Sequence, residues 1–207
     1  GSEMCIRDSP TGVELDATLV DHLNTARDWF KCNAQPWAAA SVCPIAAIDD
    51  ERVSLQGSST FKSDVLVDGF RETEVFAVIA AGISAGLEVD KRVARCWKED
   101  TPDDAMFLNA YAIAFTESAR DLGWQRLAAL AADNELLMLP HYSPGYEGWR
   151  LEDQSEVYNA LHDHGPVSVL SSGGLTPEKS TLAVFGITSR TDLSESATDR
   201  SFWDRLS

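Results

Sequence analysis

One continuous apolar run at residues 75–81 (Val-Phe-Ala-Val-Ile-Ala-Ala) constrains the fold most strongly. The run has the length of a β-strand and lies between a charged segment and Gly82. A strand that faces solvent on one side alternates apolar and polar side chains, whereas a strand covered on both faces does not. We therefore expect residues 75–81 to form the central strand of a sheet with other elements on both of its faces.

Two helices have clear starts in the sequence. A Thr-x-x-Glu capping box at residues 11–14 precedes apolar residues that recur every three or four positions, which predicts an amphipathic helix to about residue 31. A second capping box with Pro102 at the first helical position predicts another helix. Residues 105–116 of this second helix are almost entirely apolar, so we expect it to be the buried spine of the domain.

Shorter elements complete the expected order. Two extended segments on either side of a polar turn predict a β-hairpin, and Ser63 is a typical helix N-cap. The other elements that we expect are strands at 42–48 and 53–56, helices at 63–70 and after the 82–86 turn, a strand at 135–139, a helix at 151–162, and strands at 167–170 and 181–187. We expect a mixed α/β (α+β) fold in one domain over residues 10–207, with residues 1–9 as a tag remnant or disordered start.

The charge balance restricts the partner classes. The 207 residues include 33 Asp and Glu against 17 Lys and Arg, a formal net charge of −16. Such a field repels nucleic-acid phosphates and anionic membrane surfaces. No apolar stretch is long enough to span a bilayer, and no secretory signal pattern is present. We therefore expect a cytoplasmic protein that binds neither nucleic acid nor membrane.

Neither the cysteines nor the histidines are spaced as metal ligands. The four cysteines lie far apart in the sequence, and His162 and His164 lie at an expected helix end with no third ligand nearby. No Ser/His/Asp or Cys/His order and no phosphate-binding loop can be argued. The sequence therefore predicts no catalytic residue and no metal site.

Glu117 ends an apolar stripe on the second helix. Met106, Ala110, Ile113 and Glu117 are four, three and four positions apart and therefore share one helix face. A carboxylate in this position is either desolvated beside a cation or released to solvent at the edge of the domain, because unpaired burial would be costly. The sequence leaves both interpretations open.

Residues 143–146 (Ser-Pro-Gly-Tyr) form a predicted tight turn. Proline presets φ and glycine permits a positive φ, so the backbone of this turn can approach a ligand closely. Most turns of this composition are only connections between elements. Taken alone, the turn therefore does not predict a binding site.

Three motifs in a fixed order resemble the activation domain of cobalamin-dependent methionine synthase. Residues 141–146 (His-Tyr-Ser-Pro-Gly-Tyr) resemble the R-x-x-P-G-Y hallmark of the family. Residues 175–187 resemble its P-x-x-S segment and returning strand. Residues 103–121 are similar to the family helix that supplies a carboxylate to S-adenosylmethionine, and Glu117 falls on that position. The resemblance spans about residues 13–188.

The resemblance implies both a fold and a function. The fold is built around a twisted, mainly antiparallel sheet with flanking helices, and it binds S-adenosylmethionine in a shallow groove. The function is to support reductive remethylation of the cobalamin of a separate corrinoid protein, so cobalamin is present only through this partner. An electron-donor flavoprotein is a further expected partner. The residues implied in S-adenosylmethionine binding are Glu117, His141, Ser143, Gly145, Tyr146 and, at an acidic position of the family, Glu135.

The chain departs from the family pattern at several points. His141 stands where the family has arginine, so bidentate recognition of the ligand carboxylate is lost. The hairpin between Ser180 and Ile187 is shortened, and no D-x-H-x-x-G or thiolate set is present. We therefore expect a freestanding accessory subunit of the methyltransferase class and not a complete methionine synthase. The alternative is a module that docks on or caps a corrinoid protein without binding S-adenosylmethionine, and an unrelated enzyme on this scaffold is a third interpretation.

Overall fold

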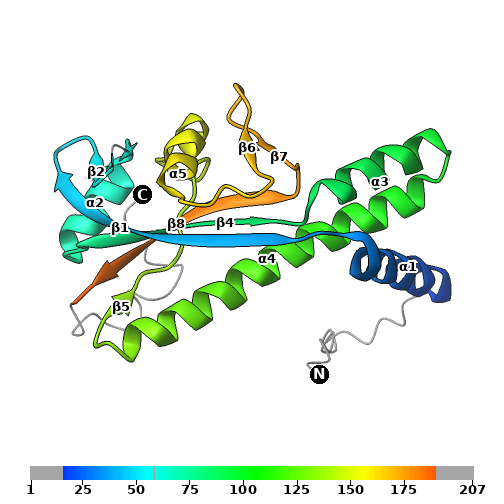
Figure 1. Ribbon diagram of the computed structural model, residues 1–207, viewed down its shortest axis with the longest axis horizontal. Coiled ribbons are helices and arrows are strands. Elements are labelled where there is room, and N and C mark those ends of the chain that lie inside the picture. The colour runs from blue at the N-terminus through cyan, green and yellow to red at the C-terminus, as the bar shows by residue number, and fades with distance from the viewer. Residues whose placement is uncertain (1–15, 58, 190–207) are drawn as a thin grey trace.

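The computed structural model describes residues 16–57 and 59–189, which form a mixed α/β fold around a six-stranded antiparallel sheet (Figure 1). The strand order is β3-β2-β1-β4-β8-β5, and β6 pairs with β7 in a separate two-stranded sheet. The strands are β1 (Trp37–Ile48), β2 (Val53–Leu55), β3 (Thr60–Phe61), β4 (Ala77–Ser84), β5 (Leu137–Met138), β6 (Ser168–Val169), β7 (Leu175–Thr176) and β8 (Ser180–Thr188). The expected fold class is confirmed. The predictions for residues 1–9 and for the capping box at 11–14 lie outside the described residues.

Helices lie on both faces of the sheet (Figure 1). The helices are α1 (Ala17–Asn33), α2 (Asp64–Glu72), α3 (Leu87–Lys98), α4 (Pro102–Ala132) and α5 (Gln154–Ala160), with a 3-10 turn at Leu151–Asp153. The Ser63 hydroxyl accepts from the Leu66 N–H at 3.2 Å and caps α2 as expected. Asp16 caps α1 by accepting from the Thr18 N–H at 2.8 Å. Within the described part of the chain, no helix combines the length and apolarity that a membrane span needs.

The predicted central strand is confirmed as β4, which pairs with β1 on one side and with β8 on the other. It begins at Ala77 and continues to Ser84, beyond the expected end at residue 81. Gly82 is therefore part of the strand and not of a turn. A Cβ at Gly82 would lie 3.0 Å from both Leu161 and Trp37 side-chain atoms, so packing across the strand explains this glycine.

Strand β1 begins at Trp37, five positions before the predicted start at residue 42. The added segment contains Ala38, Ala39 and Ala40, and alanine has low β-propensity. Pairing along the whole of β4 holds these residues extended, with Ala38 opposite Ile83. The predicted hairpin with β2 is confirmed.

Helix α4 extends along one face of the sheet from α1 and α3 to β5 (Figure 1). The prediction that its apolar stretch forms a buried spine is wrong for one face. Ala105, Leu108 and Ala112 are buried against α1 and α3, whereas Met106 is 60% exposed and Ile113 is 41% exposed. The stretch is apolar around the helix, but α1 and α3 cover one side of it only.

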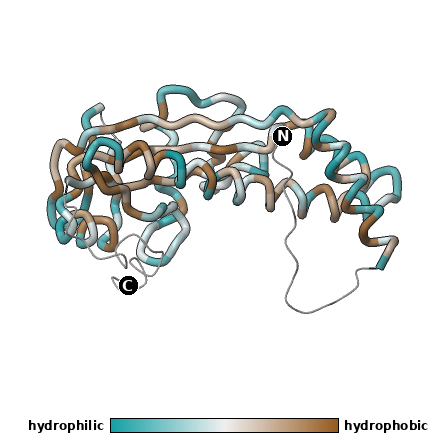
Figure 2. Tube along the Cα trace, turned by 90° about the horizontal axis from the view of Figure 1, so that it is seen from below, coloured by the Kyte–Doolittle hydropathy of each residue, from teal (hydrophilic) through white to brown (hydrophobic). Residues whose placement is uncertain are grey.

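The sheet separates two apolar layers because the side chains of its central strands alternate. Val78 and Ala80 face the core shared with α2 and α5. Ala77 and Ile79 face the second half of α4. A third cluster joins α1, α3 and the first half of α4, where the helices carry both hydrophilic and hydrophobic turns (Figure 2). The face under α4 is the one that concerns the candidate site.

Candidate functional site

The segment that carries the predicted binding turn follows the edge of the sheet. The N–H of Leu139 donates to the carbonyl of Gly186 at 2.8 Å, and Tyr142 and Val184 exchange two backbone hydrogen bonds of 2.9 and 2.8 Å. This pairing with β8 fixes where the turn begins. His141 therefore lies beside β8 and not in a free loop.

The turn itself has the tight geometry that its composition predicts. The Tyr146 N–H donates to the Ser143 carbonyl at 3.1 Å, and the Gly145 N–H donates to the Trp149 carbonyl at 2.9 Å. Gly145 has φ 95° and Gly148 has φ 73°, a region that L side chains rarely adopt. Ser143 is buried and Gly145 is exposed, so the turn presents its glycine backbone to solvent.

Aromatic rings pack against one another inside the turn. Trp149 is 2% exposed and stacks on Tyr142, with ring centroids 6.0 Å apart. The Tyr146 ring meets Tyr142 edge-on at 5.5 Å. The Tyr146 hydroxyl lies 3.2 Å from His141 Nε2, and the His141 ring lies 6.2 Å from that of Phe185 on β8. The structure therefore brings His141, Ser143, Gly145 and Tyr146 together, as predicted.

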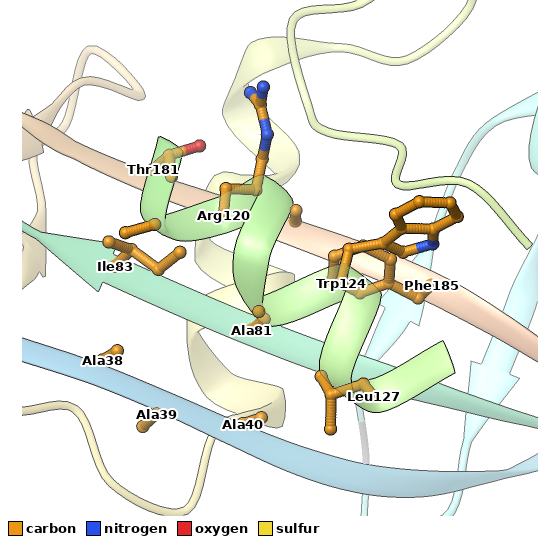
Figure 3. Close-up of a pocket in the computed structure, with 13 residues that line it drawn as sticks. Ala38, Ala39, Ala40, Ala81, Ile83, Arg120, Trp124, Leu127, Thr181 and Phe185 are labelled. Atoms are coloured by element: carbon orange, nitrogen blue, oxygen red, sulfur yellow. The ribbon is translucent and has the colours of Figure 1, made fainter. Parts of the chain in front are cut away.

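A cavity of about 230 Å³ lies between α4 and the sheet (Figure 3). Small side chains make its floor, because β1 and β4 contribute alanines where larger residues would fill the space. The residues that line it are Ala38, Ala39, Ala40, Ala81, Ile83, Ala119, Arg120, Gly123, Trp124, Leu127, Thr181, Ala183 and Phe185. Phe185 lines the cavity and also contacts His141, so it lies between the cavity and the turn.

Two side chains of α4 add polar groups to this cavity. Trp124 Nε1 is buried and has no hydrogen-bond partner among the described residues. The Arg120 side chain is 16% exposed and forms an ion pair of 3.0 Å with Asp121. Of these two polar groups, the Trp124 N–H is closed to solvent, and the Arg120 charge is paired and points away from the alanine floor (Figure 3).

The structure places Glu117 on the exposed side of α4. Within the described residues the Glu117 carboxylate has no hydrogen bond or ion pair, and it lies one turn before Arg120. The sequence left two interpretations open, and the structure shows the one in which the carboxylate is released to solvent. No contact joins Glu117 to the turn at 141–146 in this structure.

Glu135 is exposed and has φ 57° just after the end of α4. Its N–H donates to the Ala132 carbonyl at 3.0 Å, so it takes part in the helix end. The structure does not bring its carboxylate into contact with the turn. The roles of Glu117 and Glu135 in ligand binding remain predictions.

Sequence reasoning missed the cavity and the residues that line it. A signal was present in α4, where Arg120 and Trp124 are four positions apart and Ala119 and Gly123 make a small-residue pair at the same spacing. The alanines at the floor of the cavity gave no such signal, because alanine has low β-propensity and does not predict a strand. Among the described residues, no group of three or more His, Cys, Asp or Glu could hold a metal ion.

The fold and the site define a class of protein: a mixed α/β domain in which an antiparallel sheet and one long helix enclose an apolar cavity beside an aromatic turn. Among solved structures, the chain is similar to the MetH reactivation domain bound to AdoHcy, with a TM-score of 0.65 and 13% sequence identity. The similarity covers 91% of this chain and 71% of that chain. No protein-family model matches the sequence, and neither does the sequence of any curated protein. The chain therefore has the reactivation-domain fold that the sequence motifs implied.

Proposed function

We propose that this chain is an activation-like subunit that binds S-adenosylmethionine and supports reductive remethylation of cobalamin in a separate corrinoid protein. The observation that carries the proposal is the shared fold with a reactivation domain that holds AdoHcy. AdoHcy is what S-adenosylmethionine becomes when it gives up its methyl group. The ordered motifs around residues 141–146 and Glu117 support the same ligand.

The size of the cavity suggests how the ligand is divided between the interior and the surface. Ligand pockets usually measure roughly 300–1,000 Å³, and the cavity under α4 measures about 230 Å³. It therefore suits one part of the ligand, and its apolar walls favour the purine ring. The Trp124 ring lines the same cavity and can pack against the purine.

The polar end of the ligand would lie outside the cavity. The exposed backbone at Gly145 and the His141 and Tyr146 side chains offer hydrogen-bonding groups at the turn. Glu117 is exposed without a partner on α4, and its carboxylate can accept from the ligand ammonium. Arg120, which lines the cavity, could compensate for histidine at position 141 by binding the ligand carboxylate, but only by exchanging its partner Asp121 for the ligand.

The proposed reaction requires this chain only to position the methyl donor. Once an external donor has reduced cob(II)alamin by one electron, the methyl group passes from sulfur to cobalt and AdoHcy is the leaving group. No proton moves in this transfer, so no side chain needs to act as an acid or base. The contribution of the cavity and the turn is proximity and orientation of the methyl carbon.

A calorimetric titration with S-adenosylmethionine tests the proposal. We expect saturable binding, weakened at least tenfold in Glu117→Gln, because a hydrogen bond to a charged group contributes roughly 1.5–3 kcal/mol. Asp133→Asn removes an exposed carboxylate at the far end of the same helix and should leave the affinity unchanged. No binding by the wild type at millimolar ligand would contradict the proposal. Unchanged affinity in Glu117→Gln would remove Glu117 from the site.

The second candidate function is a corrinoid-docking or capping module that does not bind S-adenosylmethionine. The observation that favours it is at the turn, where His141 replaces the family arginine and contacts the Tyr146 hydroxyl. This candidate predicts that the immobilised chain retains the cobalamin-binding module of a methionine synthase to the same extent with and without S-adenosylmethionine. Retention that increases with S-adenosylmethionine favours the first proposal.

A further inference from the structure

Part of the outer edge of β1 has no neighbouring strand. β4 pairs with β1 along residues 37–44, and β2 pairs with the opposite edge of β1 only from Ile45 onward. The Pro44 carbonyl accepts from the Gln56 N–H at 2.9 Å, so the cover from β2 and the loop after it begins there. Among the described residues, no strand pairs with the outer edge of residues 37–43. Figure 1 looks onto this edge, where β1 crosses the front of the molecule.

The hydrogen-bonding groups on this free edge come from three residues. The Pro44 carbonyl points away from β4, and the register between β1 and β4 is unbroken up to this residue. Backbone groups of successive residues in a strand point to alternate sides, so Ala38, Ala40 and Val42 direct their N–H and C=O groups away from β4. All three residues are exposed, and in the described part of the chain none of these groups has a hydrogen-bond partner.

The free edge lacks the features that usually keep sheet edges apart. Natural edge strands are protected by charged side chains, by proline or by a bulge. No charged residue and no histidine lies between Lys31 and Asp49, and the bulge of β1 lies between Ile45 and Ala47, where β2 already pairs. Val42 is 60% exposed, so an apolar side chain stands on this edge. The edge is therefore suited to pairing with another strand.

The symmetry of the edge indicates which strand fits it. Pro36 and Pro44 lack an N–H and lie four positions on either side of Ala40. An antiparallel strand of the same sequence would place Ala40 opposite its own copy and Ala38 opposite Val42. Each of these pairs would exchange two backbone hydrogen bonds. The prolines would face each other at both ends, so no N–H would be left there without an acceptor.

The charge distribution is compatible with such a contact between copies. The chain has a net charge of −16, which repels a second copy at long range. Residues 32–48 contain no charged side chain, so like charges do not meet within the contact itself. An interface about a two-fold axis requires a self-complementary surface, and the free edge of β1 is one.

We propose that two copies of this chain pair through the free edges of β1, antiparallel about a two-fold axis at Ala40. The pairing joins the two six-stranded sheets into one continuous sheet. Ala38 and Ala40 also line the cavity under α4, so each copy lies beside the cavity of the other. The proposal does not rest on S-adenosylmethionine binding, since it uses the backbone of β1 alone.

Sedimentation equilibrium of the full chain, at concentrations up to millimolar, tests the proposal. We expect a reversible equilibrium between monomer and dimer. Added salt should strengthen the dimer, because it screens the repulsion between two chains of charge −16. A wild type that stays monomeric at every concentration would overturn the proposal. A dimer that dissociates as salt is added would contradict the uncharged contact.

Ala40→Pro is the discriminating variant. It removes the N–H at the two-fold axis from both copies but no hydrogen bond to β4, so the dimer should weaken at least tenfold. If this variant does not fold, Ala40→Lys places like charges opposite each other at the axis and should weaken the dimer severalfold. Ala46→Lys adds the same charge where β2 already covers β1 and is the matched control, with no change expected. Undiminished dimerisation in either Ala40 variant would overturn the assignment.

Cysteine cross-linking tests the register, in a background in which Cys5 and Cys32 are serine. Paired Cα atoms lie about 5.5 Å apart, within the roughly 4.4–6.8 Å that a disulfide spans. Oxidation should therefore link Ala40→Cys to its own copy. Ala38→Cys should not link to itself, because the two positions lie more than about 13 Å apart, but it should link to Val42→Cys. Self-linking of Ala38→Cys as readily as Ala40→Cys would overturn pairing about Ala40.

Hydrogen exchange separates a second copy from another segment of the same chain. The amides of Ala38, Ala40 and Val42 should exchange rapidly in the dilute monomer and slowly in the concentrated dimer. Slow exchange at both concentrations would show that the edge is covered within one chain, and would overturn the proposal.

Discussion

At the scale of single residues, Asp90 is a partly buried carboxylate whose ionisation opposes folding. Its pKa is raised from the ordinary 3.8 by burial, so the ionised form is less stable in the folded chain than in the unfolded chain. For an acid with a raised folded pKa, the destabilisation is full above the folded pKa. It decreases as the pH falls through the folded pKa and disappears below the unfolded pKa, where both states are protonated. Ionisation of Asp90 therefore lowers the stability of the fold at neutral pH, relative to the protonated carboxyl.

The first prediction concerns this residue. Asp90→Asn should raise the free energy of unfolding at pH 7, because a neutral amide costs less to bury than a carboxylate. The gain should shrink as the pH falls toward 3.8 and vanish below it, where the wild-type carboxylate is protonated in both states. Urea unfolding at pH 7 and at pH 4 measures both effects. The same gain at both pH values would show that ionisation of Asp90 is not its cause.

A second residue-scale prediction concerns His141. Arginine at this position would present a permanently charged, bidentate donor beside Tyr146, so His141→Arg should tighten S-adenosylmethionine binding about tenfold, near 1.4 kcal/mol. His141→Gln keeps a neutral hydrogen-bonding group and is the control, with equal or weaker binding expected. Calorimetry compares the three proteins. If arginine does not improve the affinity, the ligand carboxylate does not lie at this turn.

At the scale of elements, the sequence predicted those whose periodicity or capping is strong. The central strand, the hairpin and α2 follow from an apolar run, a polar turn and the Ser63 cap. The first part of β1 could not be predicted, because its alanines favour a strand only when β4 pairs with them. The exposed side of α4 could not be predicted either, since an apolar stretch does not reveal which neighbours are missing.

Helix α4 gives the element-scale prediction. Gly123 lies inside the helix, and a Cβ built there meets no atom within 4 Å. Gly123→Ala should raise the free energy of unfolding by about 0.5–1 kcal/mol, the cost of glycine in a helix interior. Thermal or urea unfolding measures this gain.

The same position reports on the cavity, because Gly123 lines it. Gly123→Phe should fill space that the proposed purine needs and abolish S-adenosylmethionine binding, whereas Gly123→Ala should reduce the affinity only slightly. Calorimetry compares the two variants. Full affinity in Gly123→Phe, with an unchanged circular dichroism spectrum, would place the ligand elsewhere.

At the scale of the whole molecule, the two faces of the sheet differ in packing, because one is filled and the other has a cavity. One face packs against α2 and α5, and Leu182 belongs to this core. The other face packs against α4, and Phe185 belongs to that cluster. Both residues belong to β8, three positions apart, and point to opposite faces. The sequence could predict a strand covered on both faces, but the difference between a filled face and one with a cavity depends on the fit of α4 over small side chains.

This division predicts opposite outcomes for two substitutions in one strand. Leu182→Ala removes a fully buried side chain and should cost about 2–5 kcal/mol of stability while leaving S-adenosylmethionine affinity unchanged in the folded protein. Phe185→Leu should cost less stability but weaken binding, because Phe185 lines the cavity and contacts His141. Urea unfolding and calorimetry at a temperature where both variants are folded measure the two quantities. Equal losses of affinity would mean that ligand binding depends on the stability of the whole sheet and not on the face under α4.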